Sequence, residues 1–165
     1  TYQAGIAATP QAQPLVFDLA ALYESQGRHD DAIEQYEAAL KQAPRSPAAA
    51  NNLAMMLVTY KTDPDSLARA RRLVAGLGTS TNPAYLDTYG WVLYKNGDLG
   101  PAVDAFKRAL QAAPDSGLVR YHLGMALYTQ GDKDGARENL QRALKDGSQF
   151  SGRDQAKAVL QKLAS

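Results

Sequence analysis

The chain has 165 residues, a formal net charge of +1 at pH 7 and no cysteine. The small charge argues against electrostatic binding of a nucleic-acid backbone. The lack of cysteine excludes disulfides and thiolate chemistry. No stretch approaches the ~18 consecutive apolar residues of a membrane span. Hydrophobic residues make up 45% of the chain but aromatic residues only 8%, which favours slender helices packed at small residues over a sheet.

The amino end, residues 1–12, resembles the last part of a helical unit. Its apolar residues and its proline at position 10 have the spacing found 34 residues later around Tyr36 and Pro44. The missing initiator methionine indicates a processed or excised part of a longer protein. An incomplete unit predicts an apolar face through which two copies of the chain could form a homodimer. The alternative is a frayed tail.

Residues 13–46 predict a first pair of helices. Apolar residues recur at helical spacing in both halves: Val16, Leu19, Ala20 and Tyr23, then Ala32, Tyr36, Ala39 and Leu40. Gly27 breaks the pattern, because glycine adopts the left-handed conformation that ends helices at little cost. Asp30 or Asp31 is expected to cap the second helix, and Pro44 stops it.

Residues 47–82 predict a second, irregular pair. The first helix has Ala50, Leu53, Ala54 and Leu57 at the expected positions, but the turn expands over residues 61–66. Asp63 is expected to cap the next helix and Pro64 to lie near its start. Its apolar stripe contains Leu67, Ala70, Leu73, Val74 and Leu77.

Residues 83–116 and 117–150 predict two regular pairs that repeat each other 34 residues apart. The repeated positions include Gly90 and Gly124, Leu93 and Leu127, Tyr94 and Tyr128, and Ala102 and Ala136. Residues 151–165 predict one last helix, with Ala156, Val159, Leu160 and Leu163 facing inward. A final helix with one polar face is typical of the end of a repeat array.

These units resemble tetratricopeptide repeats, whose motif is W-x2-L-G-x2-Y, then A-x3-F, then P. The third unit gives Leu86-x2-Tyr89-Gly90-x2-Leu93, Ala102-x3-Phe106 and Pro114. The resemblance implies an all-α, right-handed superhelical solenoid of helix-turn-helix repeats with a carboxy-terminal capping helix. It also implies a non-catalytic protein-interaction scaffold with a protein or peptide partner.

A narrower likeness concerns residues 82–144. They are similar to the carboxy-terminal repeats of large bacterial tetratricopeptide proteins, some of which belong to exopolysaccharide synthesis and export systems. That likeness implies a place in the bacterial periplasm or envelope, with the cytoplasm as the alternative. A self-associating structural spacer within a larger multi-repeat protein is the alternative function.

In this fold the first helices of successive units line a concave groove. Unit positions 5, 9 and 12 share one helical face, and we expect partner binding there by an aromatic and methionine stripe with one asparagine. The expected residues are Phe17, Asn51, Met55, Asp87, Trp91, Tyr94, Tyr121, Met125 and Tyr128. The alternative is that Trp91, Tyr94 and Tyr128 only pack between neighbouring units.

No residue pattern predicts a catalytic site, a cofactor or a metal. His29 and His122 have no second ligand at metal-binding spacing, so they are interpreted as a surface turn residue and a helix-face residue. The arginines at 69, 71 and 72 are interpreted as a solvated face, with an acidic partner as the alternative. A clamp for a partner's carboxyl terminus is not expected, because only Asn51 and Lys95 come close to its lysine, arginine and asparagine set.

Overall fold

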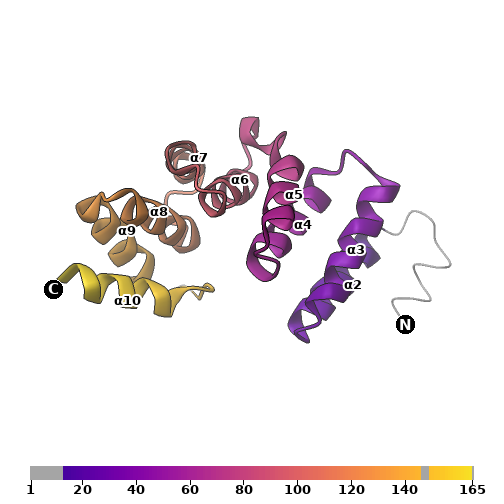
Figure 1. Ribbon diagram of the computed structural model, residues 1–165, viewed down its shortest axis with the longest axis horizontal. Coiled ribbons are helices and arrows are strands. Elements are labelled where there is room, and N and C mark those ends of the chain that lie inside the picture. Colours follow the sequence, from indigo (N-terminus) through magenta and orange to yellow (C-terminus); the bar gives the residue numbers. More distant parts are fainter. Residues whose placement is uncertain (1–12, 146–148, 165) are drawn as a thin grey trace. The chain divides into compact units, whose positions relative to one another are not determined.

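The computed structural model describes residues 13–145 and 149–164, and every regular element in those ranges is helical (Figure 1). The all-α prediction is therefore confirmed. The chain divides between Val74 and Ala75 into two compact parts, which are called the first unit and the second unit from here on. The predictions for residues 1–12, a truncated repeat and a homodimer surface, lie outside the described residues.

The first unit consists of helices that pack in chain order, α2 against α3, α3 against α4 and α4 against α5. Its helices are α2 (Gln13–Ser25), α3 (His29–Gln42), α4 (Pro47–Tyr60) and α5 (Pro64–Val74). Small residues lie where the helices approach most closely: Ala20, Ala32 and Ala39 have no exposed surface. Alanine at these positions lets neighbouring backbones approach, while Val16 and Leu53 fill the remaining interior.

The second unit repeats this arrangement and adds contacts between alternate helices, α6 with α8 and α8 with α10. Its elements are the short 3-10 helix η1 (Leu77–Thr79), α6 (Pro83–Lys95), α7 (Leu99–Ala112), α8 (Gly117–Gln130), α9 (Lys133–Lys145) and α10 (Arg153–Ala164). Gly90 allows the close packing of α6 on α7, because a Cβ there would lie 2.7 Å from the Phe106 ring.

The helix ends follow local sequence signals in most cases. Gly27 has a φ angle of 71°, as predicted for a glycine that ends a helix. Asp63 also caps α5 as predicted, because its Oδ1 accepts a hydrogen bond of 2.9 Å from the amide of Ser66. Ser46 caps α4 in the same way, by accepting from the amide of Ala49.

The predicted cap of α3 was wrong. The helix begins at His29, and its N-cap residue is Arg28, which makes no side-chain capping bond. Asp30 and Asp31 therefore lie within the first turn, where a carboxylate complements the helix dipole but is past the capping position. Asp31 instead accepts from Arg28 Nε at 2.7 Å, and Asp30 pairs with Lys61 Nζ at 2.7 Å.

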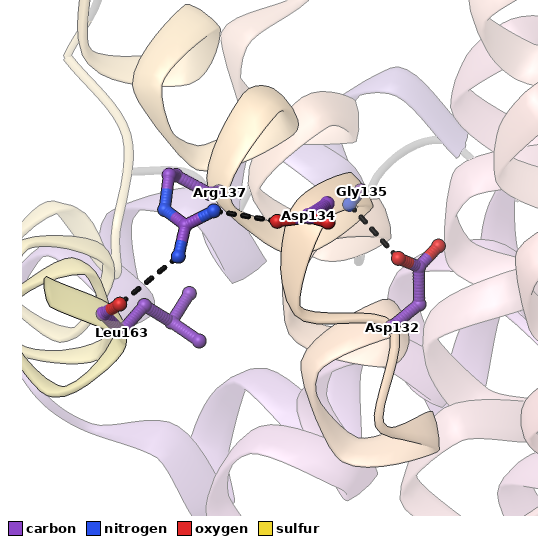
Figure 2. Close-up of polar contacts among 5 residues, drawn as sticks. All are labelled: Asp132, Asp134, Gly135, Arg137 and Leu163. Carbon is purple, nitrogen blue, oxygen red and sulfur yellow. Dashed lines mark hydrogen bonds and ion pairs between the residues drawn. The ribbon is translucent and has the colours of Figure 1, made fainter.

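The last helix, α10, packs on α9 as the sequence predicts, with Ala156 and Val159 buried. Figure 2 shows Arg137 of α9 between two acceptors, the carboxylate of Asp134 and the main-chain oxygen of Leu163 in α10. The bond to Leu163 is 3.0 Å long. It satisfies one of the last carbonyl groups of α10 with a cation, which also complements the helix dipole.

Candidate functional site

A column of stacked rings joins α6 to α8 inside the second unit. The indole of Trp91 lies 3.9 Å from the His122 ring and 4.8 Å from the Tyr94 ring, with interplanar angles of 21° and 22°. Trp91 is only 8% exposed. Lys95 Nζ lies 5.2 Å from the centre of the indole. Most of the Trp91 surface is therefore used in packing the two helices together.

A buried hydrogen-bonded pair lies beside this column. His122 Nδ1 is 2.8 Å from Asp87 Oδ1, and both residues are 4% exposed. Sequence reasoning placed Asp87 at the groove and treated His122 as a helix-face residue, and it did not connect them. The sequence feature that could have connected Asp87 to His122 is their separation of 35 residues. This is close to one repeat and places the two residues on neighbouring first helices.

Tyr121 is covered by the segment that leads into α10. Its hydroxyl donates to Gln155 Oε1 at 2.7 Å, and its ring lies 5.3 Å from that of Phe150. Burial, with a smaller contribution from Tyr94, raises the pKa of Tyr121 to about 12. Met125, one turn further along α8, is also buried. These two predicted site residues therefore belong to the interior of the second unit.

In the first unit, polar side chains from three helices form a hydrogen-bonded network. Tyr36 of α3 donates to Glu24 Oε1 at 2.8 Å, and the Asn52 side chain interacts with the same hydroxyl. Asn51 Nδ2 donates to Asn52 Oδ1 at 3.0 Å. Burial of the Tyr36 hydroxyl, followed by its bond to Glu24, raises the pKa of Tyr36. Phe17 packs beside this network, with its ring 5.8 Å from that of Tyr36.

Comparison with protein-family models gives two matches, both described as tetratricopeptide repeat, over residues 14–56 and 90–151. The chain belongs to the tetratricopeptide-repeat family. The family resemblance stated above is therefore confirmed, and the fold is a protein-interaction fold. The comparison with curated proteins gave no match.

Solved structures of other proteins share this fold. TTC0263 from Thermus thermophilus is 21% identical with a TM-score of 0.74, over 92% of this chain and 81% of that one. YrrB, described as a TPR protein with an unusual peptide-binding site, is 18% identical with a TM-score of 0.66, over 99% and 81%. A chain of the APC/C hetero-tetramer Cut9–Hcn1 is 18% identical with a TM-score of 0.79, over 99% of this chain and 32% of that one.

The predicted binding residues of this tetratricopeptide protein fall into two groups by exposure. Asp87, Trp91, Tyr121 and Met125 are buried. The others are half-buried and keep surface on the first helix of a repeat: Phe17, Asn51, Met55, Tyr94 and Tyr128. Tyr94 is held in place by the stack on Trp91 and by Thr129, whose Oγ1 lies 3.3 Å from its hydroxyl.

Across residues 13–145 and 149–164, no group of three His, Cys, Asp or Glu side chains could hold a metal ion, and no helix is long and apolar enough to cross a membrane. His29 stacks on the exposed ring of Tyr60 at 3.5 Å. In the arginine cluster, Arg69 pairs with Glu37 at 2.6 Å.

Proposed function

We propose that the protein binds a segment of a protein partner along the exposed face of the first helices of its repeats. The observation that carries this proposal is that each unit keeps half-buried side chains on its first helices, Phe17, Asn51 and Met55 in the first unit and Tyr94 and Tyr128 in the second. Aromatic and methionine side chains supply large contact areas, and an asparagine amide can bond to a peptide backbone.

Tyr94 is the strongest single anchor in the second unit. Its ring is fixed by the stack on Trp91, so little rotamer freedom is lost when a partner covers its remaining surface. Pre-ordered aromatic side chains of this kind dominate binding energies at many interfaces. The peptide-binding site named for YrrB gives general support, because that protein shares this fold.

The test is a pull-down from envelope and cytosolic fractions of the source cell with the wild-type chain as bait. Tyr94→Ala and Tyr128→Ala are each expected to weaken capture of a specific partner by about 1–3 kcal/mol, the range of interface anchors. Tyr60→Ala is the matched control, because it removes an exposed tyrosine that stacks on His29 at the start of α3. Equal capture by all three variants would exclude this face as the binding site.

The compartment belongs to the same proposal. The likeness of residues 82–144 to repeats of bacterial exopolysaccharide systems suggests a partner in an envelope assembly. Recovery of the Tyr94-dependent partner from the envelope fraction supports that context, whereas recovery from the cytosol alone contradicts it.

A further inference from the structure

The hydrogen-bonded network of the first unit has a fixed direction. A carboxylate only accepts hydrogen bonds, so the Tyr36 proton must point to Glu24. The Tyr36 oxygen then has only acceptor capacity left for its interaction with Asn52, which favours the Asn52 amide NH2 group on that side. The Asn52 oxygen is thereby turned toward Asn51, whose Nδ2 donates to it at 3.0 Å.

This direction leaves hydrogen-bond acceptors at both ends of the network. At one end, Glu24 uses Oε1 for Tyr36, and the residue is only half-buried. At the other end, Asn51 Oδ1 is a buried oxygen without a hydrogen-bond partner among the described residues. An unpaired buried acceptor is costly, and a donor from a ligand would relieve that cost once the half-buried Asn51 side chain turns outward.

The charge of the same helices favours a cationic ligand. Asp18 and Glu24 are the only charged residues of α2, and α4 has none. Three basic side chains of the first unit are paired with other carboxylates: Arg28 with Asp31, Lys61 with Asp30, and Arg69 with Glu37. In the part of the chain that the structure describes, no ion pair neutralises Glu24.

We propose that the α2–α4 face binds a basic segment of a protein partner, with Glu24 as the counter-charge for a lysine or arginine side chain. The half-buried side chains of Phe17 and Met55 would cover the aliphatic part of that residue. Tyr36 acts as a positioning residue, because it holds the Glu24 carboxylate without facing the ligand. This inference rests on the proposed function and adds the chemical class of the partner.

The test is selection from a random peptide library displayed on phage, with the full chain as bait. Wild type, Glu24→Gln and Glu34→Gln are used in parallel. Glu34 is an exposed residue of α3, so its variant removes the same charge from the same unit away from this face. Glutamine at position 24 keeps an oxygen that can accept from Tyr36, so the network and the fold are expected to persist.

We expect wild type and Glu34→Gln to select peptides rich in lysine and arginine, and Glu24→Gln to lose that enrichment. A synthetic copy of a selected peptide is expected to bind Glu24→Gln about fivefold more weakly than wild type, as for a partly exposed ion pair. The difference should shrink at high salt. Replacing the peptide's basic residues with glutamine should abolish the effect of the Glu24 substitution.

Two results would overturn the inference in different ways. Peptides that depend on Phe17, Asn51 or Met55 but show no basic enrichment would leave the proposed function in place and refute the charge preference. Failure to select any peptide sensitive to the five half-buried residues would refute the proposed function, and the inference with it. Equal loss of peptide affinity in Glu24→Gln and Glu34→Gln would show that affinity depends only on the net charge of the chain. That result would also refute the specific role of Glu24.

Discussion

The carboxylate of Asp87 and the imidazole of His122 lie 2.8 Å apart in the interior of the second unit. The pair connects α6 to α8, so one repeat is joined to the next by a polar contact as well as by apolar packing. Both groups need this partner, because removing one member of a buried pair leaves the other unsatisfied.

Asp87→Asn is expected to lower the free energy of unfolding of the second unit by about 1–3 kcal/mol, the cost of weakening a buried hydrogen bond. Urea denaturation followed by circular dichroism measures this change. Asp104→Asn on the exposed side of α7 is the control and should be nearly neutral. Equal stability of the two variants would show that the buried pair contributes nothing.

Trp91→Ala is expected to destabilise the second unit by about 3–5 kcal/mol, the range for a buried large aromatic side chain. The sequence placed Trp91 and Tyr121 among the expected binding residues, but the burial of both rings predicts that alanine at either position lowers stability. Thermal unfolding followed by circular dichroism tests this. An unchanged midpoint would mean that the stack with His122 and Tyr94 does not stabilise the unit.

Gly152→Ala is expected to be more destabilising than Gly97→Ala. Both glycines have positive φ angles, 105° and 85°, but a Cβ at 152 would lie 2.4 Å from the Tyr121 ring, whereas one at 97 meets no atom within 4 Å. The positive φ alone should cost about 1 kcal/mol, so the comparison isolates the steric part. Equal losses in chemical denaturation would argue against close packing of Gly152 on Tyr121.

Alkaline pH is expected to destabilise the protein through Tyr121. Its pKa is raised from 10.0 to about 12 in the folded state, so the unfolded chain releases this proton first. The stabilising contribution is therefore complete below pH ~10 and is lost as the pH rises toward 12. Tyr121→Phe should reduce the slope of stability against pH in this window. An unchanged slope would exclude Tyr121 as a source of the alkaline sensitivity.

The sequence predicted the helices well because their signals are local. Apolar spacing, the glycine at 27 and the Asp63-Pro64 start of α5 act within a few residues of the chain, and the structure agrees at each. The cap at Asp30 or Asp31 failed for an equally local reason. Two adjacent acidic residues suit both a cap and a first turn, and α3 begins just before them.

The sequence by itself therefore determined the repeat family, the all-α class and, through helical spacing, which residues share one face of a helix. It could not determine how much of that face a neighbouring helix covers. Trp91 and Tyr94 occupy the same face of α6, yet His122 on α8 helps to bury the first and leaves the second half-exposed. Helical spacing determines the direction in which a side chain points from its own helix. Its burial depends on side chains about one repeat away in sequence, and only the tertiary structure brings these side chains together.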